Sequence, residues 1–574
     1  MHDLVIRGGT LVDGTGSAPR TADVAIDGDR IVAVGSGIGA GRREIDATGQ
    51  VVTPGWVDIH THYDGQVTWD THLTPSGWNG VTTVVMGNCG VGFAPVRPGQ
   101  QEFLIQLMEG VEDIPGTALA EGISWEWESF PEYLDAIEKM PRAIDVGAQV
   151  PHGAVRAYVM GERGAKNEKA SPTDIQAMAA LVKAALQAGA LGFSTSRTIL
   201  HRAKDGELVP GTSASEDELL GIGRTLGEVG HGVFQVASDL LPEEDELKWM
   251  KQLSRETGRH VSFACLQNGV VPDQWRRLLK ACEEDAAQGG HITPQVAQRP
   301  AGLLLGFEST VHPFVFFAGY QALASLPVEE RLERLADPAV RASILDNPPD
   351  FSRFSGVIAM VANGFGIQFP LGHPPDYEPG PEKCIAAIAE REGRAPHEVA
   401  YDIMLERGGK GLIYLPMLGY TEGNLDAMRE MMLHPQAIYG LSDGGAHCGL
   451  ICDASVPTFL LTHWVRDRSR GERIPIEEVV AAQTRRTARF YGMEDRGTIE
   501  VGMKADVNVI DFDALRIHAP EMVYDLPARG RRLIQKVDGY SYTVCSGEVI
   551  YQGGEPTGAL PGKLIRGPQH ASAA

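Results

Sequence analysis

The sequence contains few cysteines, fewer basic than acidic residues and no long apolar run. Seven cysteines among 574 residues, odd in number and irregularly spaced, give no disulfide framework and indicate a reducing compartment. The 51 basic and 75 acidic residues leave a net charge of −24. Because a surface this acidic repels phosphate backbones and anionic lipids, we expect neither nucleic acid nor membrane partners.

The N-terminus also lacks the apolar core of a signal peptide. MHDLVIRGGTLVDGTG alternates apolar and polar residues and reaches glycine within eight positions. Nothing in it is long enough to span a bilayer. We therefore expect a cytoplasmic protein that acts on a small molecule, and the sequence leaves a homo-oligomer open.

The pattern of apolar and polar residues changes twice along the chain. Residues 1–53 contain short β-branched runs separated by glycine and aspartate turns, which predict a small antiparallel sheet. Between 54 and 490, apolar strands such as WVDIH and GVFQVASD alternate with longer helical patterns, which is typical of parallel βα units. The antiparallel style returns in 491–574, whose last residues are small and polar and are expected to fray. We predict an α/β chain in which a (β/α)8 barrel lies beside one β module built from both chain ends.

The predicted barrel segment is longer than a barrel needs. Eight βα units take about 250 residues, whereas 54–490 is far longer. Stretches such as VPDQWRRLLKACEEDAAQ and VEERLERLADPAVRASIL interrupt the βα rhythm. We therefore predict an insertion at about 269–375.

The strongest local signal is WVDIHTHYDG, in which an apolar strand ends in His60 and His62. Side chains two apart on a strand point to the same face, so both imidazoles can reach one metal ion. An H-x-H pair alone is weak evidence. Its position after the first barrel strand strengthens it, because barrel active sites form where the strand C-termini emerge.

Two further residues end predicted barrel strands. GVTTVVMGNCG delivers Cys89 at the same rim, where a metal-bound thiolate is a better interpretation than an inert buried thiol. AIYGLSDGGAH brings Asp443 to the end of the last strand. A carboxylate there would bind the metal and take a proton from the bound water, although an aspartate before two glycines is often just a turn former.

These motifs carry a family resemblance. The chain resembles the amidohydrolase superfamily, and within it the N-acyl-D-amino-acid deacylase (D-aminoacylase) group. The resemblance rests on DLVIRGGTLVDGTG, PGWVDIHTHYD, GVTTVVMGNCGVGFAP, VPHGAVR, GALGFSTS, GLSDGGAH and TARFYGMEDRGTIEVGMKADVNVID, in this order along nearly the whole chain. It implies a metal-dependent barrel with a split β-sandwich, and hydrolysis of the amide bond of an N-acyl amino acid of D type or a related N-acyl amine.

The resemblance also implies a zinc centre of one or two ions, with other divalent metals open. His60 and His62 would hold the metal, Cys89 would lie at a second position or bridge two ions, and Asp443 would act as general base and acid. Further candidates are His152 in VPHGAVR, His447 beside the substrate carbonyl or the metal water, and Tyr63 as an oxyanion donor.

Two departures from the deacylase pattern stand out. The fifth and sixth strands, GVFQVASD and HVSFACLQ, do not end in the expected histidines. His231 and His260 lie instead at the strand starts, on the barrel floor, and the rim offers Cys265 as a weak zinc ligand. His447 to Thr458 also lacks the arginine that would clamp a substrate carboxylate, so Arg197 or Arg202 would have to replace it.

Two other functions compete with deacylation. A cyclic-amide hydrolase of the hydantoinase or dihydropyrimidinase type uses the same barrel, but its carboxylated lysine has no counterpart in the fourth strand, GALGFSTS. A non-catalytic scaffold with a decayed metal site would explain the missing rim histidines. The intact His60, His62, Cys89 and Asp443 argue against it.

Overall fold

A closed ring of eight parallel strands forms the centre of the computed structural model, which describes residues 1–571. The strands lie in chain order: β6 (Trp56–Asp58), β7 (Val81–Met86), β8 (Asp145–Pro151), β9 (Gly192–Arg197), β10 (Val233–Ser238), β11 (Val261–Cys265), β12 (Ile292–Val296) and β16 (Ile438–Tyr439). Thr61 and Gly444, which continue β6 and β16, pair in parallel and close the ring. The predicted (β/α)8 barrel is confirmed.

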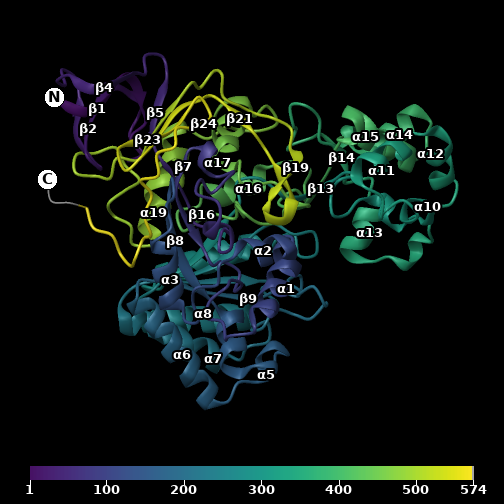
Figure 1. Ribbon diagram of the computed structural model, residues 1–574, viewed down its shortest axis with the longest axis horizontal. Helices are drawn as coiled ribbons and strands as arrows, with labels where there is room; N and C mark the ends of the chain where they lie inside the picture. Colours follow the sequence, from purple (N-terminus) through teal and green to yellow (C-terminus); the bar gives the residue numbers. More distant parts are fainter. Residues whose placement is uncertain (572–574) are drawn as a thin grey trace.

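Helices cover the outside of the barrel, where Figure 1 shows α6, α7 and α8. The layer includes α1 (Gln101–Glu112), α3 (Phe130–Glu138), α4 (His152–Met160), α6 (Pro172–Gln187), α7 (Glu216–Val229), α8 (Glu243–Thr257), α9 (Gln274–Ala286), α16 (Asp426–Met432) and α18 (Ile476–Ala481). Strands β7 and β8 are buried at every position, as expected for parallel strands with helices outside and side chains inside. Local sequence fixes the helix starts. The Ser171 hydroxyl accepts a hydrogen bond from the Asp174 backbone amide, and the Asp174 carboxylate accepts one from the Ser171 amide.

Both chain ends contribute to one nine-stranded sheet with its own apolar core. Its strands are β1 (His2–Leu11), β2 (Arg20–Asp27), β3 (Arg30–Gly35), β4 (Gly41–Asp46), β5 (Val51–Pro54), β17 (Val507–Ile510), β22 (Tyr540–Cys545), β23 (Glu548–Gln552) and β24 (Glu555–Pro556). β5 and β17 pair antiparallel and join the N-terminal part to the C-terminal part. We call this sheet the β module. A hairpin of β19 (Glu521–Leu526) and β20 (Gly530–Ile534) follows β17 along the chain and contacts the barrel.

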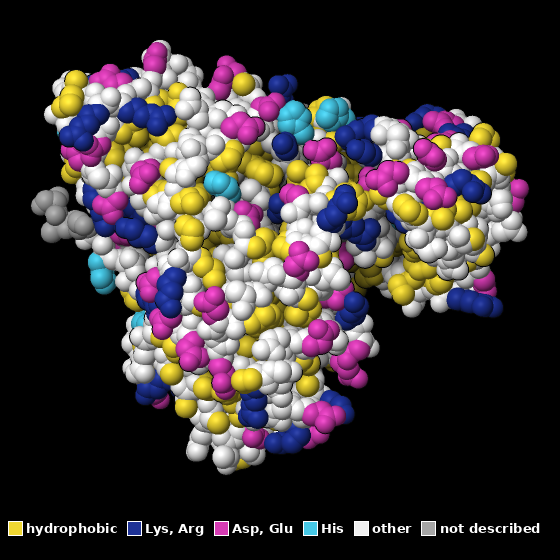
Figure 2. All heavy atoms as spheres, in the orientation of Figure 1, with side chains coloured by type: hydrophobic (Ala, Val, Ile, Leu, Met, Phe, Trp, Pro, Cys, Tyr) yellow, Lys and Arg dark blue, Asp and Glu magenta, His cyan; other side chains and the backbone are white. Residues whose placement is uncertain are grey.

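The insertion differs from the expected range of about 269–375. Helix α9 and strand β12 are regular parts of the barrel, so the insertion begins at 297 and ends near 425, before α16 packs back against β12. The sequence predicts α9 as part of the insertion because its helical pattern interrupts the expected βα rhythm. The inserted residues form a lobe beside the barrel (Figure 1 and Figure 2), with a separate aromatic-rich core and the sheet β13 (Ala301–Leu305), β15 (Ile413–Leu418) and β14 (Phe369–Pro370).

The C-terminal segment, expected to fray, lies along the start of β8. The Val146 amide donates to the Lys563 carbonyl at 3.0 Å, and the Ile565 amide donates to the Val146 carbonyl at 2.7 Å. The backbone pairing extends to Gln569, whose carbonyl accepts from Glu494 at 2.9 Å. Within residues 1–571, no helix is both long and apolar enough to cross a membrane.

A buried ionic cluster joins the β module to the barrel floor. Asp145, at the start of β8, lies 2.6 Å from Arg496 Nη1 and 3.2 Å from Lys504 Nζ, and all three side chains are buried. The Lys563 amide also donates to Asp145 at 2.8 Å. Burial alone would raise the pKa of Asp145, but the charges of Lys504 and Arg496 lower it to about 2. Its contribution to stability is therefore present above the ordinary aspartate pKa and is lost as pH falls towards 2.

We expect Asp145→Asn to reduce the free energy of unfolding by about 3–5 kcal/mol, because it leaves two buried cations without their shared partner. Chemical denaturation followed by circular dichroism measures the change. The matched control is Asp135→Asn, which removes an exposed partner of Arg566 and should cost at most about 1 kcal/mol. Equal effects of the two substitutions would show that the cluster does not hold the domains together.

Candidate active site

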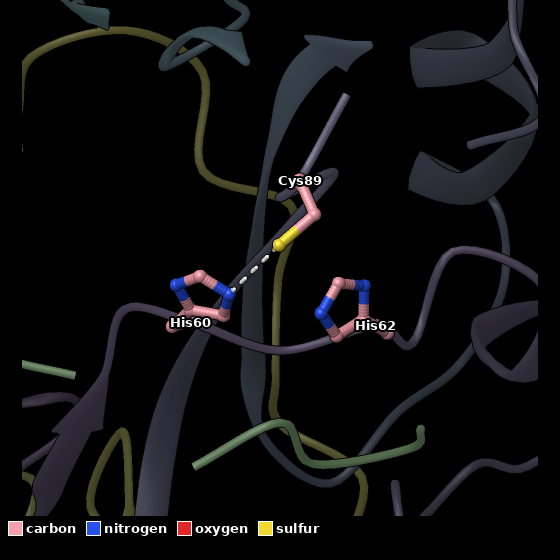
Figure 3. A group of neighbouring side chains, drawn as sticks. All are labelled: His60, His62 and Cys89. Atoms are coloured by element: carbon pink, nitrogen blue, oxygen red, sulfur yellow. Dashed lines mark hydrogen bonds between the residues drawn. The ribbon is translucent and has the colours of Figure 1, made fainter. Parts of the chain in front are cut away.

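Two histidines and a cysteine meet at the carboxyl ends of the first two barrel strands (Figure 3). His60 and His62 follow β6, are each 1% exposed, and have their ring centroids 5.5 Å apart. Cys89 follows β7 and extends towards both rings, with its Sγ 3.4 Å from His60 Nε2. The structure thus brings together the three residues that sequence reasoning placed at one rim.

Asp443 completes the cluster from the opposite side of the barrel seam. Its Oδ1 lies 3.3 Å from His60 Nε2 and 3.5 Å from His62 Nε2. A tetrahedral ion with bonds of about 2.0–2.3 Å separates its ligand atoms by roughly 3.3–3.8 Å. The separations of Asp443 Oδ1 from the two Nε2 atoms, and of Cys89 Sγ from His60 Nε2, lie in this range.

The chemistry of these residues also fits a bound cation. Neither ring nitrogen of His62 has a hydrogen-bond partner among the described residues. Burial and the nearby carboxylates of Glu112 and Asp443 raise the pKa of the Cys89 thiol well above its usual range. A thiolate at this position needs a positive charge beside it, and zinc binds the observed combination of sulfur, nitrogen and carboxylate donors.

Acceptor groups behind the two imidazoles orient them towards the same point. His60 Nδ1 lies 2.6 Å from Gln295 Oε1, on β12. His62 Nδ1 lies 3.3 Å from Glu112 Oε1, within ion-pair distance although the two atoms form no hydrogen bond. An acceptor facing Nδ1 favours the tautomer that leaves the Nε2 lone pair free, so both rings are prepared to bind a metal through Nε2.

Glu112, which sequence reasoning missed, is a buried carboxylate between two histidines. It is the last residue of α1 and is 1% exposed. Its Oε2 lies 3.5 Å from His447 Nε2, which in turn is 3.7 Å from Asp443 Oδ2. Burial would lower the pKa of His447, but the hydrogen bond to Asp443 and the charge of Glu112 raise it to about 9. A helix terminus 26 residues after β7 gives no sequence signal for this role.

Backbone strain is concentrated in the same cluster. Cys89, Asp443 and His447 have φ values of 56°, 49° and 54°, in the left-handed region that non-glycine residues rarely adopt. Gly445, at φ 92°, permits close packing, since a Cβ there would lie 2.9 Å from the Tyr63 ring and 3.0 Å from the His62 carbonyl. The fold thus holds these side chains in position before any ligand binds.

Three of the predicted site residues lie elsewhere. Both ring nitrogens of His152 have partners, Thr195 at 2.8 Å and Glu218 at 3.0 Å, which favours a structural role. The Tyr63 hydroxyl contacts Ser76 Oγ at 2.7 Å and is fully buried, so it is not free to bind an oxyanion. Cys265 is outside the cluster of possible metal ligands. Gln235 faces the barrel interior and pairs with Ser262 on the neighbouring strand. Because side chains alternate along a strand, Cys265, three residues after Ser262, lies on the outer face of β11.

Polar residues stand where the deacylase pattern has histidines on the fifth and sixth strands. Gln235, inside β10, accepts a hydrogen bond from the Cys89 amide at 3.0 Å and so positions the thiol loop. His201, in the loop after β9, lies with its Nδ1 3.0 Å from Ser196 Oγ. Burial, together with the charges of His447 and His62, lowers the pKa of His201 to about 4. The loop after β9 thus holds this ring beside the carboxyl end of that strand.

The two arginines proposed to bind a substrate carboxylate differ in availability. Arg197 is bound by Glu246 through two nitrogens, at 2.8 and 2.6 Å, and also donates to the Ala214 carbonyl. Arg202 is exposed and donates to Gly206 in its own loop. A third arginine, Arg532 of β20, lines a cavity of about 20 Å³ together with Asp443. The arginine missing after β16 thus has a possible substitute from the C-terminal hairpin.

Fold and cluster together define a (β/α)8-barrel protein with a candidate metal centre at the strand carboxyl ends. Residues 43–551 match the model of the amidohydrolase family. The chain therefore belongs to the amidohydrolase family, and the resemblance noted in the sequence is confirmed.

The relatives include the group that the sequence motifs resemble. N-acyl-D-glutamate deacylase of Alcaligenes xylosoxydans xylosoxydans is 27% identical over 573 residues, covering 98% of this chain and 96% of that protein. D-aminoacylase of the same organism is 34% identical over 233 residues, covering 40% and 43%. Among solved structures, a D-aminoacylase with a binuclear metal centre has a TM-score of 0.65 at 24% identity, covering 99% and 100%. This last similarity is evidence for the fold.

We expect Glu112→Gln to weaken zinc binding by about 10- to 100-fold, because the loss of the charged acceptor behind His62 reduces the basicity of that ligand. Competition with a chromophoric chelator measures the dissociation constant. Glu109→Gln is the matched control, since Glu109 lies on the same helix but pairs with the surface residue Lys204. Unchanged zinc affinity in Glu112→Gln would contradict this role.

Proposed function

We propose that this protein hydrolyses the amide bond of an N-acyl amino acid of D type, using a metal ion held by His60, His62, Cys89 and Asp443. The observation that carries the proposal is the meeting of His60, His62 and Cys89 at the catalytic end of an amidohydrolase barrel, with Asp443 Oδ1 3.3 and 3.5 Å from the two histidine Nε2 atoms. The full-length similarity to N-acyl-D-glutamate deacylase supports the substrate class.

Zinc suits this donor set, and it is present in a solved N-acyl-D-glutamate deacylase from Bordetella bronchiseptica, which has a TM-score of 0.63 at 24% identity over 98% of this chain and 99% of that one. When bound, the ion polarises the scissile carbonyl and lowers the pKa of water. One ion suffices for the four donors, because Gln235 and the outward-facing Cys265 supply no second site on β10 and β11.

The chain's own residues divide the proton transfers between them. Asp443 accepts a proton from the attacking water through a carboxylate oxygen and returns it to the leaving nitrogen. His447, cationic through its contacts with Asp443 and Glu112, donates a hydrogen bond to the substrate carbonyl oxygen. Glu112 keeps His62 and His447 oriented.

The alternatives have less support. A cyclic-amide hydrolase of the hydantoinase type would need a lysine on the fourth strand, and β9 carries none between Gly192 and Arg197. A scaffold with a decayed site would not need strained residues at Cys89 and Asp443, because strain persists where the surrounding structure maintains it for function.

We also propose a cytoplasmic location, since all seven cysteines are buried free thiols.

Arg532 is the residue we propose for the carboxylate of the amino-acid substrate. It lines the cavity beside Asp443 and is bound by Asp525, at 2.7 and 2.8 Å, and by Thr74. Asp525 is about half exposed, whereas Arg532 is buried. A substrate carboxylate can therefore take the place of Asp525 without leaving the arginine unpaired.

We expect Asp443→Asn to fold normally and to lose at least about a thousandfold in kcat, because asparagine cannot accept the proton. Steady-state hydrolysis of an N-acyl-D-amino acid by zinc-loaded protein, with thermal unfolding as the folding check, tests this. Asp453→Asn is not a suitable control because Asp453 pairs with the buried Arg299. Asp467→Asn, at the surface, is suitable. A tenth of the parent kcat remaining in Asp443→Asn would assign the base to another residue.

We expect the parent to prefer a free N-acyl-D-amino acid to its carboxamide by about 30-fold or more in kcat/KM. Arg532→Gln should lose that preference, because it removes the buried charged partner of the substrate carboxylate. The ratio of the two substrates cancels general losses of activity or stability. Arg197→Gln should retain the parent ratio because Arg197 is occupied by Glu246. A ratio that collapses in Arg197→Gln instead would place the carboxylate at the loop after β9.

A further inference from the structure

Exposed aliphatic side chains are concentrated on one side of the barrel mouth. Nine large apolar residues are exposed among residues 1–571, and four of them lie in the loops after three successive barrel strands. Ile199 and Leu200 follow β9 and are 62% and 61% exposed, Leu241 follows β10 at 59%, and Val270 follows β11 at 87%. We call these four residues the rim patch. Single exposed aliphatics are common, but a group on adjacent loops marks a binding surface.

Hydrogen bonds tie the three loops together. Asp239 accepts from the Thr198 hydroxyl and, at 2.9 Å, from the Ile199 amide, which connects the loops after β9 and β10. The buried Gln274 donates to the Leu240 carbonyl at 3.0 Å and accepts from Asn268 at 3.0 Å, which connects the loops after β10 and β11. The rim patch is therefore part of one supported surface.

This surface adjoins the candidate active site. Leu200 directly precedes His201, whose Nδ1 lies 3.0 Å from Ser196 Oγ, and Ser196 packs against Gly90, the neighbour of Cys89, where an added Cβ would lie 2.7 Å from the Ser196 amide. All three loops leave the carboxyl ends of their strands, the end at which His60, His62 and Cys89 meet.

The strand order fixes which part of the substrate would reach the rim patch. Asp443 and His447 follow β16, so the leaving nitrogen must lie on that side to receive its proton. β9 is four strands away from β16 in either direction around the eight-stranded ring and therefore faces it across the mouth. With the amine at β16, the acyl group extends towards β9, β10 and β11.

We propose that the rim patch is a subsite for a long, apolar acyl chain, so that the preferred substrates are N-acyl amino acids with fatty acyl groups. This inference rests on the proposed deacylase function and names its acyl specificity. The covering of four exposed aliphatics by a methylene chain provides the driving force.

A chain-length series tests the proposal on zinc-loaded, full-length protein. The substrates are the acetyl, butanoyl, hexanoyl and octanoyl derivatives of one D-amino acid, below their aggregation concentrations. Complete burial of a methylene is worth about fourfold, and a surface patch covers one side of the chain, so we expect about twofold in kcat/KM per methylene. Six methylenes then give roughly a 60-fold preference for octanoyl over acetyl.

The triple variant Leu200→Ser, Leu241→Ser and Val270→Ser should reduce the octanoyl-to-acetyl ratio to below about fivefold. The matched control is Val501→Ser, which changes a 51% exposed valine beside the β module and should keep the parent ratio. A flat chain-length series in the parent, or a ratio that survives in the triple variant, overturns the proposal. If Ile358→Ser, on the insertion lobe, lowered the octanoyl-to-acetyl ratio as much as the triple variant does, the rim patch would serve closure of that lobe. This outcome would also overturn the proposal.

Binding of the free acids separates this inference from the proposed function. Calorimetry with octanoate and acetate needs no turnover, and we expect octanoate to bind the parent at least about tenfold more tightly than the triple variant. If no N-acyl amino acid is hydrolysed while octanoate binding depends on the patch, the deacylase function fails and the apolar subsite stands. If hydrolysis occurs and octanoate binds no better than acetate, the subsite fails and the deacylase function stands.

Discussion

The backbone seam between the first and last barrel strands is the constraint on which the site depends. The His62 amide donates to the Gly444 carbonyl at 2.8 Å, and the Asp443 amide donates to the His60 carbonyl at 3.1 Å. These two bonds connect positions nearly four hundred residues apart and set the distance between the histidine pair and the aspartate. The candidate metal ligands are therefore held in place by closure of the barrel, and the side chains behind them adjust orientation alone.

Polar groups fill the space around this seam in layers. Gln295, Glu112 and Gln235 each face a ligand residue or its backbone, and none of them is exposed. Buried polar groups of this kind are costly unless they are paired, so their presence around four donors indicates that the arrangement is maintained for chemistry. The same layer explains how the site can lack histidines on β10 and β11 and still form a compact donor set.

The sequence was most informative where function follows a strand end. His60, His62, Cys89 and Asp443 each end an apolar run, and a barrel brings such ends together, so their proximity could be predicted before the structure. Glu112 could not, because it depends on where the loop after β7 folds back. Gln295 could have been found as an inward polar residue on an otherwise apolar strand. The partners of His152 and Tyr63 could not be predicted, because position in the sequence does not show which way a ring turns. The insertion was misplaced because the helical pattern of α9 interrupts the expected βα rhythm.

The pairing of residues 561–569 with the start of β8 has a consequence for biosynthesis. Asp145 receives its hydrogen bond from Lys563 and its charge partners from Arg496 and Lys504, so the floor of the barrel cannot be completed until the ribosome has translated almost the whole chain. Contacts this distant in sequence form late in folding. Until then the nascent barrel carries a buried acid without its cations, and chains that terminate early keep that defect and are candidates for capture by chaperones and proteases.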